Sequence, residues 1–338
     1  MHSSVTRILK LLIAAALTAG LALAVAACGS SSSGSSGGDI SLVAYSTPEE
    51  AYNDLIPAFQ KTSDGQDTDF KTSFGGSGDQ SRAVESGQPA DVVHFALQPD
   101  MQRLVDAGKI ADDWDQNQYH GIVEDSVVSF VVRKGNPDNI QTWDDLVQPG
   151  VEVIVPNPFQ SGGAKWDLMA AYGAQINEGA SDQEAQDFLK TLLEHVPVQP
   201  GSASDATSTF TSGKGDVLIS YENEAIAAQQ AGEDVDYVIP DDTILIETPI
   251  ATTTDAGDAA QAFVDYQYTD EAEQIWADHG YRPVVQPVFD KNKKDFPVPS
   301  GQFTIDDLGG WDKVNADFFD PENGIIAGIE RDLGVATG

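Results

Sequence analysis

The sequence is short of cysteine: Cys28 is the only one in 338 residues. A single thiol cannot form a disulfide within the chain, so cross-links cannot replace a packed core. A chain of this length can bury enough apolar surface to be stable without them. We therefore expect ordinary hydrophobic cores, in about two domains of roughly 150 residues each.

Basic residues are also scarce. Lysine and arginine together number 18, against 54 aspartates and glutamates, which gives a formal net charge of −36. Such acidity disfavours nucleic acid as a partner and disfavours adsorption to anionic lipid. The histidines are few and scattered, and none stands at a spacing typical of a zinc site. We predict no metal, no cofactor and no nucleic-acid partner.

The N-terminus has the features of an export signal. Arg7 and Lys10 precede an apolar run over 11–26, and the small residues 25–27 lead into Cys28. This order is typical of a secretory signal peptide over residues 1–27, not of a transmembrane helix. A lone cysteine at this place resembles a bacterial lipobox, in which the cysteine is lipidated. An ordinary signal peptide followed by an unrelated cysteine is the alternative.

A segment of almost pure serine and glycine follows the cysteine. Such a composition cannot bury apolar surface and behaves as a flexible coil. We therefore interpret residues 28–39 as the lipidated Cys28 and a tether. The prediction is an extracytoplasmic protein, anchored by lipid to the cell membrane.

Short apolar runs alternate with helix-like stretches from residue 40 onward, which is typical of an α/β protein. Two β-rich runs, at 126–132 and 245–253, are placed so that the piece between them is about one domain long. They predict one lobe from residues 40–127 plus 247–338, and a second lobe from residues 128–246. Two consecutive domains would have a similar composition, so that alternative stays open.

Three segments rich in glycine and serine lie at predicted helix starts: 75–78, 161–164 and 201–207. The first N–H groups of a helix have no partner within the helix, and the helix dipole makes that end positive. Glycine allows close backbone approach and serine adds a hydroxyl donor. Together these features can bind an anion without any cation. Taken singly, each segment also fits a plain helix cap or turn.

Longer motifs point to one family. The chain resembles the sulfate- and thiosulfate-binding periplasmic receptors of ABC transporters in GGSGDQ (75–80), ESGQPADVVHFAL (85–97), VVRKGNP (131–137), WDDL (143–146), PNPFQSGGAKW (156–166), GDVLISYENEA (215–225), YRP (281–283) and FTIDDLGGW (303–311). The resemblance implies the type II periplasmic-binding-protein fold. In that fold two α/β lobes are joined by a two-strand hinge, and the ligand cleft lies between them.

The resemblance also implies the ligand contacts. It places them on Ser46, Ser77, Ser161, Gly162, Gly163, Ala203 and Tyr221. Three positions depart from the family: Ser46 stands where the family has aspartate, Tyr221 where it has tryptophan, and Ser204 where it has arginine. In the family the backbone makes the contact at position 46, so the resemblance implies the same for Ser46. Tyr221 would donate through its O–H, and the loss of the arginine weakens the positive field.

The function implied is transport. A monomeric receptor would close on sulfate or a related tetrahedral oxyanion and present it to an ABC permease and its ATPase, with no chemistry of its own. One alternative is a secreted sulfate- or phosphate-ester hydrolase with Ser77 or Ser161 as nucleophile, although the chain has no Gly-x-Ser-x-Gly motif to supply the usual context. Another alternative is a tethered oxyanion sensor.

Overall fold

The computed structural model describes residues 38–337. The predicted signal peptide, the lipidated Cys28 and the tether up to residue 37 lie outside the described residues. No helix in the described part of the chain combines the length and the apolar character needed to cross a membrane.

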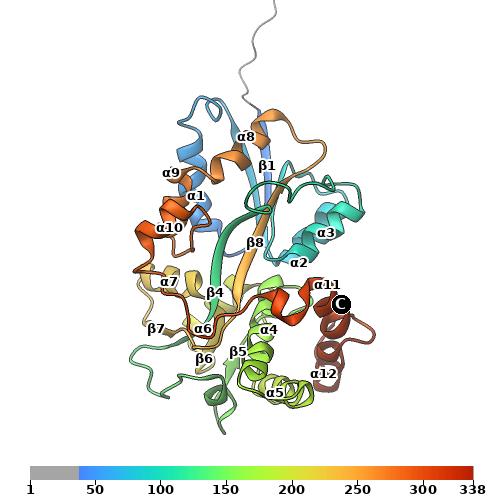
Figure 1. Ribbon diagram of the computed structural model, residues 1–338, viewed down its shortest axis with the longest axis vertical. Helices are drawn as coiled ribbons and strands as arrows, with labels where there is room; N and C mark the ends of the chain where they lie inside the picture. The colour runs from blue at the N-terminus through green and yellow to red at the C-terminus, as the bar shows by residue number, and fades with distance from the viewer. Residues whose placement is uncertain (1–37, 338) are drawn as a thin grey trace, which may run out of the picture. The chain divides into compact units, whose positions relative to one another are not determined.

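One twisted sheet runs through the described chain (Figure 1). Its strands are β1 (Asp39–Tyr45), β2 (Asp69–Gly75), β3 (Val92–His94), β4 (Ile122–Arg133), β5 (Val153–Ile154), β6 (Val217–Tyr221), β7 (Val235–Val238) and β8 (Leu245–Thr252). They are ordered β2-β1-β3-β8-β4-β6-β5, with β7 also paired to β4. β1 pairs in parallel with β2 and β3, whereas β4 is antiparallel to β6, β7 and β8.

β4 and β8 are long strands that pair with each other and also with strands from the two halves of the sheet. Residues 122–127 of β4 pair with residues 245–249 of β8. Beyond them, residues 128–132 of β4 pair with β6, and residues 250–252 of β8 pair with β3. The two predicted β-rich runs therefore fall on the strands that connect the two halves of the sheet.

The helices cover the sheet and follow its strands in the chain. They are α1 (Glu49–Phe59), α2 (Ser77–Glu85), α3 (Gln98–Asp106), α4 (Gly162–Asn177), α5 (Asp182–Glu194), α6 (Ala203–Thr211), α7 (Glu222–Gln230), α8 (Asp258–Gln267), α9 (Asp270–Asp278), α10 (Gln286–Asn292), α11 (Gly310–Val314) and α12 (Ile325–Leu333). Side-chain caps mark the starts of α5, α6 and α9. Ser181 and Glu184 form a capping box at α5, for example, in which the Glu184 side chain accepts the Ser181 N–H at 2.8 Å.

A core around β1 holds one half of the sheet. Its members from β1, such as Leu42 and Ala44, pack with Tyr52 of α1, Phe263 of α8 and Trp276 of α9. Tyr52 and Trp276 meet edge to face, with ring centroids 5.4 Å apart. Fully burying large side chains of this kind contributes about 1.5–3 kcal/mol each.

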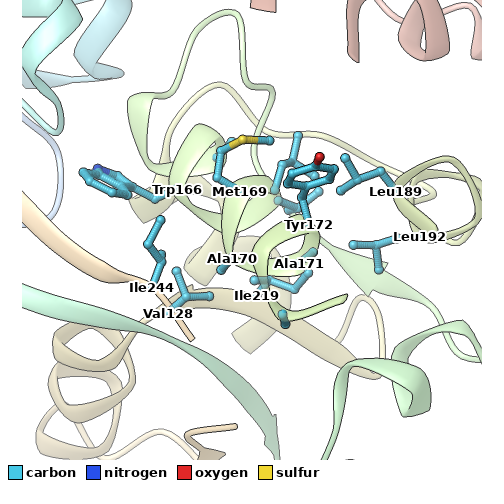
Figure 2. Close-up of a cluster of buried hydrophobic side chains, with 14 of the residues drawn as sticks. Val128, Trp166, Met169, Ala170, Ala171, Tyr172, Leu189, Leu192, Ile219 and Ile244 are labelled. Carbon is cyan, nitrogen blue, oxygen red and sulfur yellow. The ribbon is translucent and has the colours of Figure 1, made fainter. Parts of the chain in front are cut away.

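A second core surrounds α4, which is apolar on most of its faces. Figure 2 shows α4 at its centre, with the labelled side chains Val128, Trp166, Met169, Ala170, Ala171, Tyr172, Leu189, Leu192, Ile219 and Ile244. Trp166 is fully buried, and its indole N–H donates to the Ala96 carbonyl at 2.7 Å. The helix thereby joins the middle of the chain to the segment that follows β3.

The C-terminal segment packs on the same helix. Phe303, Trp311 and Phe318 belong to the core around α4. A Cβ added to Gly173 of α4 would lie 2.2 Å from the Phe303 ring, so only glycine lets that ring approach. We predicted this segment as part of the first lobe, whereas its buried side chains pack with the middle of the chain. The division into lobes itself stays a prediction.

Candidate functional site

The three predicted Gly/Ser segments meet. The Gly78 amide in α2 donates to the Gln160 carbonyl at 3.1 Å. A Cβ added to Gly76 would lie 2.8 Å from that carbonyl oxygen and 2.7 Å from the Gly201 carbonyl oxygen. The start of α2 therefore touches both the segment before α4 and the segment before α6. Glycine is required at position 76 because any side chain would collide with backbone.

The first turn of α4 lies close to Ser77 and Leu97 at Gly162, and close to Tyr221 at Gly163. A Cβ added to Gly162 would lie 3.1 Å from Ser77 Cβ and 2.6 Å from Leu97 Cδ2. A Cβ added to Gly163 would lie 3.4 Å from Ser161 Oγ and 3.5 Å from the Tyr221 hydroxyl. The first turn of α4 is buried, and the absence of side chains at Gly162 and Gly163 lets Ser77, Leu97 and Tyr221 pack against it.

The two serine hydroxyls have different partners. Ser77 Oγ donates to Asp100 Oδ2 at 2.6 Å and accepts the Ala96 N–H at 3.0 Å. To donate to an anion, Ser77 would have to turn its proton away from Asp100. Ser161, the residue before α4, makes no side-chain capping bond in the described structure and is 3% exposed. Its hydroxyl is therefore the freer donor.

Tyr221 carries an unpartnered buried hydroxyl. The residue ends β6, is 1% exposed, and its hydroxyl oxygen has no hydrogen-bond partner among the described residues. Burial raises the pKa of Tyr221 well above its ordinary value, and the charges of Asp167 and Glu124 add to the rise. The phenol therefore keeps its proton and can act as a donor. Leaving such a group unpaired costs about 1–3 kcal/mol, which is what a ligand contact would offset.

Ser46 lies against the start of α6, which contains Ala203. Ser46 follows β1, and its Oγ accepts the Ser204 N–H at 3.4 Å. Ala203 is the first residue of α6 because Ser202 caps the helix, accepting the Asp205 N–H at 3.1 Å. The predicted segment 201–207 thus enters the helix at residue 203. Ser204, where the family has arginine, contributes its amide to this junction.

Sequence reasoning missed the buried carboxylates around the site. Glu224, in the first turn of α7, is 7% exposed and accepts from Thr207 Oγ1 at 2.8 Å. Burial raises the pKa of Glu224 to about 7. Asp167 in α4 is 2% exposed, and burial raises its pKa as well. Asp100 had no signal beyond its place in a helix start, and none of the three could be recognised as buried from the sequence.

The fold and the gathered donors are those of a solute-binding protein. Residues 40–282 match the family described as bacterial extracellular solute-binding protein. The sulfate-binding protein of Synechococcus elongatus is 40% identical over 321 residues, covering 90% of this chain and 92% of the relative. A thiosulfate-binding protein of Escherichia coli is 35% identical, covering 80% of this chain and 85% of the relative.

Among solved structures, the sulfate-binding protein SubI from Mycobacterium tuberculosis H37Rv is similar at a TM-score of 0.81 and 49% identity, covering 83% of this chain and 99% of that chain. The chain belongs to the bacterial extracellular solute-binding protein family. The predicted periplasmic-binding fold and the resemblance to sulfate- and thiosulfate-binding receptors are confirmed.

Proposed function

We propose that the chain is the binding subunit of an ABC importer and that it takes sulfate, or a related tetrahedral oxyanion such as thiosulfate. The observation that carries this proposal is the meeting of three helix starts, one of which, the start of α4, lies against the unpartnered, protonated Tyr221 hydroxyl. The likeness to receptors named for sulfate and thiosulfate supports the same ligand class.

The ligand would be held by dipoles and hydroxyls. The first amides of α4 and α6, the amide at Ser46, and the hydroxyls of Ser77, Ser161 and Tyr221 are the donors we assign to it. A helix N-terminus carries about half a positive elementary charge. Several such ends at short range can bind a dianion although the chain as a whole has a net charge of −36. The bound oxyanion would also give the Tyr221 hydroxyl its missing partner.

Ligand closure would use β4 and β8 as the hinge. These strands pair with each other at their middle and with different strands at their far ends. We assign residues 40–127 and the part of the chain from 247 to about 302 to one lobe, and residues 128–246 to the other. The segment from Phe303 onward would move with the second lobe, because its core side chains pack on α4. Closure should reduce the radius of gyration in small-angle scattering on addition of ligand.

Anchoring completes the proposal. Lipidated Cys28 and the tether over 28–39 would hold a monomeric receptor at the outer face of the cell membrane, where it reaches the permease and ATPase. The chain would perform no catalysis. A tethered sensor would have the same site, and co-purification with a permease distinguishes the two roles.

The hydrolase alternative has one structural observation in its favour, since Ser77 is bonded to the carboxylate of Asp100. That carboxylate is also paired with Arg103 at 2.9 Å, so both of its oxygens already have partners. We expect no turnover of chromogenic sulfate or phosphate esters. Turnover that is lost in Ser77→Ala would replace the transport proposal.

Titration calorimetry of the protein without its signal peptide tests the ligand class. Sulfate is fully ionised near neutral pH and only accepts hydrogen bonds, whereas hydrogen phosphate carries a proton that needs an acceptor. An unpaired buried polar group is costly, so we expect sulfate to bind at least about 100-fold more tightly than phosphate. Equal binding of the two would show that Ser77, with its own proton on Asp100, accepts the phosphate proton. Binding of no oxyanion would refute the proposed function.

A further inference from the structure

A buried chain of polar side chains begins at the residue before Ser46. Tyr45, the last residue of β1, donates its hydroxyl to Glu124 Oε1 at 2.6 Å. Glu124 lies on β4, and its cross-strand partner on β8 is Thr248, which donates to the same carboxylate oxygen. Glu124 and Thr248 are both fully buried. One carboxylate thus joins the end of β1 to both of the strands that connect the halves of the sheet.

The chain continues on the other side of Thr248. His94 Nε2 lies 3.1 Å from Thr248 Oγ1, and His94 Nδ1 lies 2.8 Å from the Tyr52 hydroxyl. Burial lowers the pKa of His94, although Glu124 opposes that shift. With His94 neutral, one proton order satisfies every bond: Tyr52 donates to Nδ1, Nε2 donates to Thr248, and Thr248 donates to Glu124.

Stability alone does not account for this carboxylate. Removing a carboxylate from water is costly, and an apolar residue of similar size is often at least as stabilising in a core. Glu124 Oε2 has no hydrogen-bond partner in the described chain, so the desolvation of the group is only partly offset. Yet Glu124 makes a short bond to the residue next to Ser46. The partners of Glu124 therefore indicate that this carboxylate holds the end of β1 in place.

We propose that Glu124 and Tyr45 are positioning residues for the anion site: the Tyr45–Glu124 bond fixes the end of β1 against the connecting strands, so that the Ser46 amide meets the ligand. This inference rests on the proposed function and deepens it. Ser46 in turn contacts Ser204 of α6. The bond consequently links the amide at Ser46, the start of α6 and the strands about which the lobes would move.

Two buried tyrosines provide a matched comparison. Tyr45→Phe removes the hydroxyl that bonds Glu124, whereas Tyr52→Phe removes one at the far end of the same chain. The two residues are 3% and 1% exposed. We expect both variants to lose a similar amount of thermal stability. Only Tyr45→Phe should weaken sulfate binding, by about tenfold, because its loss frees the β1 end, while Tyr52→Phe should stay within about twofold of wild type.

Thr248 provides a second test if Tyr45→Phe folds poorly. Thr248→Val keeps the shape of the side chain but removes its hydroxyl, and it should weaken sulfate binding by about five- to tenfold. Thr248→Ser restores the donor and should restore the affinity. A purely structural role predicts instead that affinity follows thermal stability in all four variants.

Calorimetry with sulfate on the four variants and wild type decides the matter. Wild-type affinity in both Tyr45→Phe and Thr248→Val would overturn the positioning role and leave the proposed function standing. Equal weakening in Tyr45→Phe and Tyr52→Phe would also overturn it. A wild-type protein that binds no oxyanion would overturn both proposals.

Discussion

Replacement of Tyr221 by phenylalanine should change ligand affinity and stability in opposite directions. The substitution keeps the ring, which is 1% exposed at the end of β6, and removes only the hydroxyl. That hydroxyl is buried and has no hydrogen-bond partner among the described residues. In the free protein the unpaired hydroxyl lowers the stability of the fold. In the proposed complex it donates a hydrogen bond to a dianion.

The magnitudes follow from these two states. An unpaired buried hydroxyl costs about 1–3 kcal/mol, so its removal should raise the free energy of unfolding of the ligand-free protein by about 1 kcal/mol. A hydrogen bond to a charged group contributes about 1.5–3 kcal/mol, so sulfate affinity should fall by about 10- to 100-fold. Few substitutions of buried residues are expected to stabilise a protein and also weaken the binding of its ligand.

Urea denaturation without ligand and calorimetry with sulfate measure the two quantities. Tyr266→Phe is the control, because Tyr266 is a tyrosine of α8 that is 7% exposed and packs in the core around β1. Its substitution should leave sulfate affinity unchanged. The reasoning would fail if Tyr221→Phe bound sulfate as tightly as wild type, or if it lost stability as a variant with a broken internal hydrogen bond does.

Three further predictions concern the two serines of the site, Cys28 and Glu224. Ser161→Ala should weaken sulfate binding by about 10- to 100-fold and Ser77→Ala by less, because Ser77 already donates to Asp100; a larger loss in Ser77→Ala on calorimetry would contradict this order. Cys28→Ser should move the protein from the membrane fraction to the soluble fraction with unchanged sulfate affinity, and continued membrane retention would argue against lipidation. Burial raises the pKa of Glu224 from 4.5 to about 7, so the native protein holds this proton where the unfolded chain has lost it. Wild-type stability should therefore fall by about 3 kcal/mol between pH 4.5 and 7 relative to Glu224→Gln, and parallel urea denaturation profiles for the two proteins would show that the carboxylate is not held in this way.

Local sequence was informative wherever a structure depends on neighbouring residues. The alternation of apolar runs and helical stretches predicted an α/β protein, and the helices α2 and α4 begin inside the predicted segments, at Ser77 and Gly162. The helix α6 begins at Ala203, inside the third predicted segment, because Ser202 caps it. The motifs carried the resemblance to the family, which supplied the candidate ligand residues.

Long-range packing determined how those residues are used. The proton of Ser77 is held by Asp100, a residue 23 positions away, and Glu124 is bonded to Thr248, a residue 124 positions away. No local pattern distinguishes a buried carboxylate from the many solvated ones in a chain with 54 acidic residues.

The sequence by itself therefore determined the class of fold, the segments in which α2, α4 and α6 begin and the kind of donor each could offer, because caps, turns and glycine conformations depend on adjacent residues. Only the tertiary structure decided which helix starts meet, which hydroxyl is already bonded and where the C-terminal segment packs. Each of these depends on distances between residues far apart in the chain, such as Phe303 against Gly173. Such distances are set by the packing of whole elements, and a single sequence does not display them.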